Sequence, residues 1–318
     1  MAKKKYRKKK KHIKSIPTTL FAILSCCIAL GISMLYEYYD TLPESKKKAL
    51  IGQTIRLTET VKERLESETE IGFDQALPKH APNNARLTLS AGAELPLTPS
   101  HLTEEVVVHK GYTASYNQDY LIPNWVAYEL TVKEIKGKAT RNNQFVEDPD
   151  LKGKSATDKD YYSSGYDRGH MAPAGDMKWD TQAMDESFYF SNICPQAPNL
   201  NRGVWRILEE ALRERVRQDS AILIVCGPIV DDRQKKRIGK NKVRVPQSFF
   251  KVIVTPYSDP VKGIGFIFPN DDCPEKLSTY AVSIDEVERI TGIDFFHKLP
   301  KALEEKVESE CRFDEWAF

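Results

Sequence analysis

The most informative stretch of this sequence is residues 166–210, which read YDRGHMAPAGDMKWDTQAMDESFYFSNICPQAPNLNRGVWRILEE. It combines an Asp-Arg-Gly-His run, a segment rich in Pro and Gly, and two clusters that contain asparagine. Between Asn201 and Arg217, the apolar residues Val204, Leu208 and Leu212 recur at four-residue steps, which predicts a helix. Polar side chains are therefore concentrated just before this helix and along it.

Apolar segments on both sides of this stretch predict β-strands. Residues 125–132 (WVAYELTV) alternate with period two, and residues 105–109, 221–230, 249–255 and 263–268 are apolar strand candidates. Residues 283–291 and 299–309 predict short helices. Strands before and after a long central helix predict a mixed α+β fold.

Four residues are candidates for chemistry, and each has a structural alternative. A neutral imidazole at His170 suits a general base, but a lone histidine is more often structural. Asn201 is a typical helix N-cap at this place, and its side-chain oxygen also suits Mg²⁺. Glu209 is either an exposed helix acid or a group that orients a metal-bound water. Arg141 is either an ordinary loop arginine or a phosphate clamp.

The joint order of these residues resembles the DNA/RNA non-specific endonuclease family, which includes endonuclease G. The matching pattern is D-R-G-H-x-A-P-A followed by S-N-I-x-P-Q-x-x-x-L-N-x-G-x-W-x-x-L-E, and residues 123–128 (PNWVAY) match the family's early strand. The resemblance covers roughly residues 105–300. It implies a ββα-metal nuclease fold in which a strand pair and a helix hold one cation, and we expect a mixed central sheet.

The resemblance implies a metal-dependent hydrolysis. His170 falls on the general base, Asn201 on the direct metal ligand, and Glu209 on the residue that positions a metal-bound water. The implied cofactor is Mg²⁺, with Mn²⁺ or another divalent cation as a substitute. Water would attack phosphorus and leave 5′-phosphate products.

The resemblance also implies supporting residues and partners. Asn192 falls on a polar position near the histidine, Arg168 on the motif arginine near the phosphate, and Arg141 on the phosphate-stabilising arginine, while Asp167 is expected to support the site. We expect both DNA and RNA as substrates, because nothing in this set of residues would sense a 2′-hydroxyl. Members of the family often form homodimers, so a homodimer is a further expectation.

The N-terminal part of the chain predicts a membrane anchor. Nine positive charges lie in the first fifteen residues, and no charged residue occurs from Ile16 to Leu35. A run of about twenty uncharged residues can cross a bilayer as a helix, and the basic flank predicts a cytoplasmic N-terminus. A cleaved signal peptide and a lipid-modified cysteine are alternatives, and a mitochondrial presequence fits less well because the basic run is mostly Lys and a continuous apolar block follows it. We therefore expect a single-pass membrane protein whose catalytic domain is extracytoplasmic.

Four segments follow from this pattern. They are a basic cytoplasmic tail (1–15), a transmembrane signal anchor (16–36), a stalk and linker (37–102) and the endonuclease domain (103–318). The 318 residues have a net charge of +2, but without the first fifteen the net charge is −7. This excludes a broadly basic nucleic-acid coat protein, so any polyanion must be bound by local basic groups.

Several further residues leave alternatives open. The basic residues between Arg233 and Arg244 form either a substrate-guiding loop or an ordinary solvated loop. Tyr161, Tyr162 and Tyr166 either stack on bases or pack in the domain. For the cysteines outside the anchor, we expect Cys194 and Cys226 to be buried and Cys273 to pair with Cys311. Their sequence order shows no C-x-x-C pattern typical of zinc.

Three functions compete at this stage. The leading one is a membrane-anchored, metal-dependent endonuclease that does not distinguish DNA from RNA. The alternative is a nucleic-acid binding and processing component of a DNA uptake system. The third is a non-catalytic nucleic-acid-binding domain, which conflicts with the intact set of His170, Asn201 and Glu209.

Overall fold

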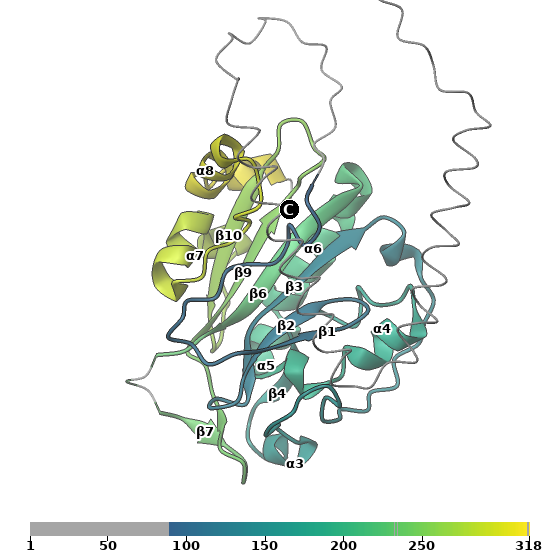
Figure 1. Cartoon of the computed structure of the whole chain (residues 1–318), viewed down its shortest axis with the longest axis vertical. Helices are drawn as coiled ribbons and strands as arrows, with labels where there is room; N and C mark the ends of the chain where they lie inside the picture. Colours follow the sequence, from purple (N-terminus) through teal and green to yellow (C-terminus); the bar gives the residue numbers. More distant parts are fainter. Residues whose placement is uncertain (1–88, 232, 234, 317) are drawn as a thin grey trace, which may run out of the picture. The chain divides into compact units, whose positions relative to one another are not determined.

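A seven-stranded sheet forms the centre of the computed structural model, which describes residues 89–231, 233, 235–316 and 318 (Figure 1). Its strand order is β1-β2-β3-β6-β9-β10-β11, and every neighbouring pair is antiparallel. The strands of this sheet are β1 (Glu105–Val108), β2 (Thr113–Asn117), β3 (Ile122–Thr131), β6 (Ala221–Ile229), β9 (Ser248–Val254), β10 (Gly263–Pro269) and β11 (Ala281–Val282).

In the described part of the chain, two short strand pairs and six α-helices accompany the sheet. The pairs are β4 (Asp167–His170) with β5 (Ile193–Gln196), and β7 (Arg237–Ile238) with β8 (Val243–Arg244). The helices are α3 (Asp158–Tyr161), α4 (Thr181–Glu186), α5 (Pro198–Arg202), α6 (Val204–Asp219), α7 (Ile284–Thr291) and α8 (Lys301–Ser309).

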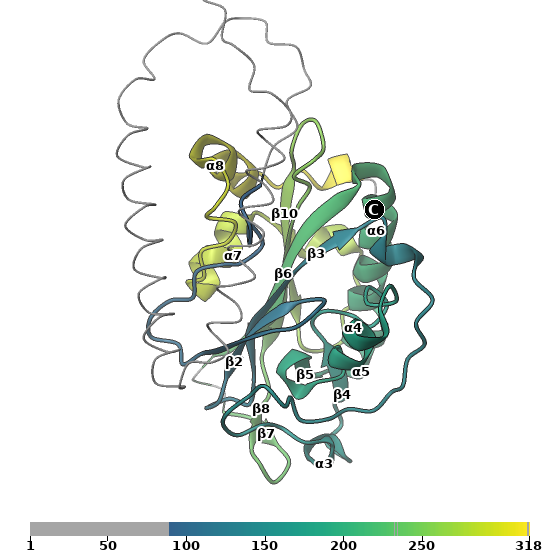
Figure 2. The ribbon, with the colours of Figure 1, turned by 45° about the vertical axis from the view of Figure 1, so that its right-hand side comes forward.

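Alternation along the central strands divides the core into two layers. In β9, Phe249 and Ile253 belong to the cluster that includes α6, whereas Phe250 and Val252 belong to the cluster that includes α7. Successive side chains of a strand point to opposite faces, so one sheet supports both layers. Helices α4, α5 and α6 accordingly lie on one side of the sheet, and α7 and α8 lie on the other (Figure 2).

Helix α6 is held by an aromatic contact with the sheet. The Trp205 ring meets Phe249 and Phe268 edge-on, with both ring centroids 5.8 Å away. Leu208 and Leu212 are buried on the same side of the helix, as the apolar spacing predicted. This contact holds the N-terminal half of α6 against β9 and β10 of the sheet.

The structure confirms the α+β class and corrects two expectations. The central sheet is antiparallel rather than mixed. The chain between β3 and β6 contains the antiparallel β4–β5 pair, and it re-enters the sheet as β6, which runs antiparallel to β3. The expected helix 201–217 is two helices that meet at Gly203. A Cβ atom at Gly203 would lie 2.2 Å from the Asn199 carbonyl oxygen, so only glycine allows this junction.

The N-terminal predictions fall mostly outside the described residues. This is the case for the basic tail, the anchor at 16–36 and residues 37–88. No helix formed by the described residues is long and apolar enough to cross a membrane. Residues 89–102, which the sequence places in the linker, pack on the domain: Leu97 bridges to Asp294, and Trp125 Nε1 donates to Thr98 Oγ1 at 2.7 Å.

All four cysteines of the described domain are free thiols, so the expected Cys273–Cys311 disulfide is wrong. Cys273 is buried after β10 and its Sγ donates to the Pro269 carbonyl oxygen at 3.4 Å, whereas Cys311 is exposed beyond α8. Cys194 and Cys226 are buried, as predicted.

Candidate active site

The predicted site residues are carried by β4, β5 and the short helix that follows them. In the β4–β5 pair, His170 lies opposite Ile193 and Gly169 lies opposite Cys194. A Cβ atom at Gly169 would lie 2.2 Å from Gln196 Oε1, which explains the glycine between Arg168 and His170. Pro198 then begins α5, where the ring's fixed φ favours helix initiation.

Asn192 braces the segment that follows His170. Its Oδ1 accepts from the Ala172 backbone N–H, and its Nδ2 donates to the Ala172 and Ser187 carbonyl oxygens, all at 2.8 Å. The side chain is fully buried, and these three bonds use its amide on both sides. Asn192 therefore fixes the backbone of Ala172, two residues after His170.

His170 is half-buried between two aromatic rings. Its centroid lies 5.0 Å from the perpendicular Phe188 ring and 5.4 Å from the Phe145 ring. Its Nε2 atom is buried and has no hydrogen-bond partner in the described part of the chain. Burial, followed by the positive charge of Arg141, lowers the pKa of His170 to about 3. The imidazole is therefore neutral at pH 7, with an unpaired ring nitrogen.

The two aromatic rings also bring two arginines to His170. The Arg141 guanidinium carbon lies 5.4 Å above the Phe188 ring, and that of Arg168 lies 4.8 Å above the Phe145 ring. Arg168 also donates to Asp158 Oδ1 at 2.6 Å across a largely exposed ion pair. Two guanidinium groups close to a neutral imidazole form a surface suited to a phosphate.

Asn201 is held by Asp167 and does not cap a helix. It is the fourth residue of α5, and its Nδ2 donates to Asp167 Oδ2 at 2.9 Å. Arg202 donates to both oxygens of Asp167, at 2.8 and 2.6 Å. Burial would raise the pKa of Asp167, but the bonds from Arg202 and Asn201 lower it below its ordinary value. Since no described residue donates to Asn201 Oδ1, this oxygen is available to a cation.

An open pocket of about 340 Å³ adjoins these residues. Its lining consists of Phe145, Tyr161, Tyr162, Ser163, Tyr166, Asp167, Arg168, Asn201 and Arg202, and does not include His170 or Arg141. Tyr161 is buried against Phe190, so its packing role is confirmed, whereas Tyr162 is 83% exposed.

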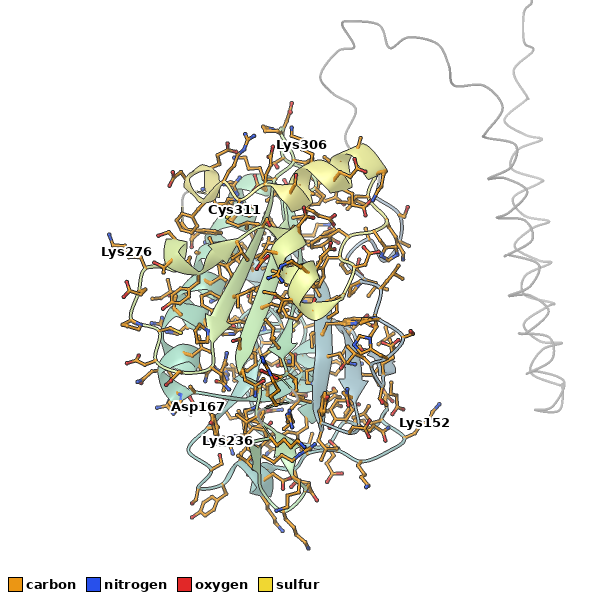
Figure 3. The ribbon with its side chains drawn as sticks, turned by 90° about the vertical axis from the view of Figure 1, so that its left-hand side faces the viewer. Lys152, Asp167, Lys236, Lys276, Lys306 and Cys311 are labelled. Carbon is orange, nitrogen blue, oxygen red and sulfur yellow. The ribbon has the colours of Figure 1, made fainter. Side chains whose placement is uncertain are left out.

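The basic segment predicted from the sequence lies beside this pocket. It forms the β7–β8 pair, and Lys236 Nζ lies 4.8 Å above the Tyr166 ring. Figure 3 shows Lys236 and Asp167 at the same end of the domain. Lys236 therefore places one positive charge of this segment beside the pocket residue Tyr166.

Glu209 lies in a different charged environment from the other candidates. It is half-buried on α6, and burial raises the pKa of its carboxyl to about 7 although Lys251 opposes the increase. Asp176 and Arg213, which form a 2.7 Å ion pair, are its other charged neighbours. In the described residues, no hydrogen bond or ion pair joins Glu209 to His170 or Asn201. Its expected role with water stays a prediction.

Three residues of the site were missed in the sequence. Phe145 and Phe188 resemble ordinary core residues there, and only the structure shows that they join His170 to the arginines. Lys251 is fully buried, its Nζ lies 4.4 Å above the Trp205 ring, and it is the charged neighbour of Glu209. A single lysine inside the apolar run FFKVIVT was a signal for it.

Comparison with known proteins extends these observations. The family model described as DNA/RNA non-specific endonuclease matches residues 94–302. The chain is 38% identical over 209 residues to mitochondrial nuclease EXOG of Danio rerio, covering 61% of each chain. It is 33% identical over 212 residues to the mitochondrial nuclease of Saccharomyces cerevisiae, covering 59% of this chain and 64% of that one.

A solved structure has a similar fold. The crystal structure of the EndoG/EndoGI complex matches with a TM-score of 0.58 and 30% identity, covering 63% of this chain and 88% of that chain. The match to the two mitochondrial nucleases spans roughly three fifths of their length.

Proposed function

The chain belongs to the DNA/RNA non-specific endonuclease family, and from this membership we propose that it hydrolyses phosphodiester bonds of DNA and RNA with a divalent metal ion. The observation that carries the proposal is the unpartnered Nε2 of a neutral His170, held between two rings that each support an arginine. A base without a proton beside two fixed cations suits attack of water on a phosphodiester.

The residues around Asn201 fit a hard divalent cation. Asp167 orients the Asn201 amide through Nδ2, and this leaves Oδ1 as a neutral oxygen ligand. Mg²⁺ typically binds through one or two protein oxygens and keeps several waters, so a single asparagine suffices. We propose Mg²⁺ as the cofactor, with Mn²⁺ as a substitute. When bound, the ion would neutralise charge that develops on the phosphate and the leaving oxygen.

The protein's own groups would carry out the proton transfer and the positioning. His170 would accept the proton of the attacking water at Nε2. Arg141 and Arg168 would bind phosphate oxygens, and their charge would then no longer act fully on the imidazole. Because a bound anion raises the pKa of a neighbouring histidine, His170 would become a stronger base once the substrate is in place. Asn192 would keep the segment after His170 fixed during this change.

The pocket supports a substrate without sequence preference. Its lining offers arginines for phosphates and the exposed Tyr162 ring for stacking on a base. The β7–β8 segment adds further positive charge at the pocket edge. Contacts of these kinds read the backbone and the base plane rather than base edges, so we propose both DNA and RNA as substrates.

We also propose that residues 16–36 anchor the protein in a membrane, with residues 1–15 cytoplasmic and the catalytic domain extracytoplasmic. The uncharged run and its basic flank support this arrangement. A homodimer is a proposal by family membership alone.

The test is cleavage of supercoiled plasmid and of a single-stranded RNA by the full chain, with Mg²⁺ or with EDTA. We expect Mg²⁺-dependent cleavage of both substrates by the wild type and the loss of both in His170→Ala and Asn201→Ala. His101→Ala, which changes an exposed histidine outside the site, is the matched control and should cleave normally. Full activity in either site variant would refute the assignment. DNA binding without cleavage by the wild type would favour the DNA uptake function instead.

A further inference from the structure

A second cluster of charged groups lies between α7 and α8, on the opposite side of the sheet from α6. These helices lie at the far end of the domain from Asp167, near the labelled Lys306 and Cys311 (Figure 3). The pocket between them has a volume of about 330 Å³. Its lining contains six carboxylates and one lysine: Asp285, Glu288, Asp294, Glu304, Glu305, Glu308 and Lys301.

Three of these carboxylates converge on one point. One carboxylate oxygen each from Asp285, Glu288 and Glu308 lies within 4.8 Å of the other two. Asp285 and Glu288 are one turn apart on α7, and Glu308 comes from α8. Ca²⁺ binds oxygen at about 2.3–2.6 Å, so two of its ligands lie up to about 5 Å apart. The three oxygens are therefore close enough to share one ion.

Glu308 is the residue that distinguishes this pocket from an ordinary acidic surface. It is only 5% exposed, and its Oε1 has no hydrogen-bond partner in the described part of the chain. A buried carboxylate without a partner is unfavourable, because it loses its hydration and gains nothing in exchange. It lines the acidic pocket, so the partner it lacks would be a group that enters from solvent.

Another buried carboxylate cluster in the domain shows the contrast. Asp148 is buried as deeply, but its Oδ2 meets His109 Nε2 at 2.8 Å and its Oδ1 accepts from the Asp150 backbone N–H at 2.9 Å. Both carboxylate oxygens of Asp148 therefore have hydrogen-bond partners within the protein. In the α7–α8 pocket, the only basic lining residue, Lys301, lies 3.5 Å from Glu304 and outside the three converging groups.

We propose that Asp285, Glu288 and Glu308 bind a divalent cation, with calcium preferred, at a site separate from the catalytic one. Calcium fits better than magnesium because it accepts several carboxylates in an irregular arrangement, whereas Mg²⁺ requires near-octahedral geometry and retains its waters. The ion would connect α7 to α8 and so secure the C-terminal layer against the sheet. The proposed cation site takes no part in the nuclease reaction and shares no residue with the catalytic site.

Burial and neighbouring acids disfavour ionisation of two of these groups. Burial, followed by the charges of Glu288 and Glu304, raises the pKa of Glu308 to about 9. Burial, with Asp294 and Asp285 as further acidic neighbours, raises the pKa of Glu288 to about 7.

The test is the melting temperature of the full chain, purified in detergent at pH 8, in EGTA and in increasing CaCl₂. All proteins carry Asn201→Ala, which removes the catalytic ligand so that binding there does not contribute. At calcium about 100-fold above its dissociation constant, we expect the melting temperature to rise by about 5–10 °C. In Glu308→Gln and Glu288→Gln, this increase should disappear. Glu275→Gln, an identical change at an exposed acid outside the pocket, should keep it.

The glutamine variants also distinguish the loss of calcium binding from the loss of folding. Glutamine keeps the size of the Glu308 side chain and cannot supply a carboxylate, so Glu308→Gln should melt close to its parent in EGTA, and a folded variant is available for comparison. No calcium-dependent increase in the parent, or an equal increase in Glu308→Gln, would overturn the site. A larger increase with MgCl₂ than with CaCl₂ would overturn the calcium assignment. Since melting is the readout, none of these results depends on nuclease activity.

Discussion

His170 and His109 occupy opposite environments within one domain. Both rings pack against aromatic side chains: His109 lies 4.9 Å from Tyr112, and His170 lies 5.0 Å from Phe188. His109 Nε2 meets the buried Asp148 carboxylate at 2.8 Å, whereas His170 Nε2 meets no described residue. Burial alone therefore does not distinguish a structural histidine from a reactive one. These two histidines differ in their partners: the paired nitrogen of His109 stabilises the fold, whereas Nε2 of His170 has no hydrogen-bond partner among the described residues.

The largest expected effect concerns catalysis at His170. Removal of a general base commonly costs about 10²–10⁴-fold in rate, so His170→Gln should lower single-turnover plasmid cleavage by that factor. The melting temperature should change little, because Nε2 has no protein partner to lose. His109→Gln is the matched variant and should retain nearly full cleavage. Equal losses of rate in both variants would remove the distinction between the two histidines.

The second effect concerns stability at His109. His109→Ala removes one hydrogen-bond partner of the buried Asp148 carboxylate, which keeps the Asp150 backbone N–H and Ser191, and the loss of a partner by a buried polar group costs about 1–3 kcal/mol. We expect this loss in the free energy of unfolding measured with urea, and a similar one in Asp148→Asn. His170→Ala should lose clearly less. If His109→Ala unfolds at the wild-type urea concentration, the pair is not a structural element.

The smallest effect is a difference in acid sensitivity. The pKa of His170 is lowered to about 3 in the folded protein, against about 6.5 when unfolded, so the unfolded chain binds more protons between these values. Stability that is present above pH 6.5 is therefore lost as the pH falls. Between pH 7 and pH 4.5, the free energy of unfolding of His170→Gln should fall by about 1 kcal/mol less than that of the wild type. The value is this small because partial exposure of the His170 ring screens part of its pKa shift.

Asp148 responds in a lower window and provides the control for this measurement. Burial opposes ionisation of Asp148, but hydrogen bonds from His109 and Ser191 lower its pKa below the ordinary value. The Asp148 carboxylate therefore stabilises the folded protein above its unfolded pKa, near 4, and this stabilisation is lost only at lower pH. The urea midpoints measured at pH 7 and at pH 4.5 should therefore differ less in His170→Gln than in the wild type. In Asp148→Asn they should differ as much as in the wild type. Parallel losses in wild type and His170→Gln would contradict the neutral, buried state of His170.

Much of the fold and the order of the site residues could be predicted from the sequence. Period-two and apolar runs located β3, β6, β9 and β10, because burial of one or both sheet faces is encoded in neighbouring residues. Strand direction is not encoded in this way, so the antiparallel sheet was missed. The junction at Gly203 was also missed, because apolar spacing continues across it and only the close approach to Asn199 reveals it.

The contacts of the site were harder to predict than its members. Asp167 and Asn201 are far apart in the sequence, and only the β4–β5 pairing brings the amide to the carboxylate. The helical spacing favoured an N-cap for Asn201, and that interpretation failed because α5 begins earlier, at Pro198. The convergence of Glu308 with Asp285 and Glu288 likewise depends on the packing of α7 on α8, which no local pattern specifies.

The β4–β5 pair has a consequence for the order in which the protein folds. Gly169 pairs with Cys194 within a short segment, whereas Val126 of β3 pairs with Cys226 of β6, 100 residues further along the chain. Contacts between distant residues form slowly, because a long loop must close before any pairing stabilises it. The pairs β1–β2, β2–β3, β9–β10 and β4–β5 all close shorter loops than β3–β6, so we expect closure of β3 on β6 to come after these local pairs have formed.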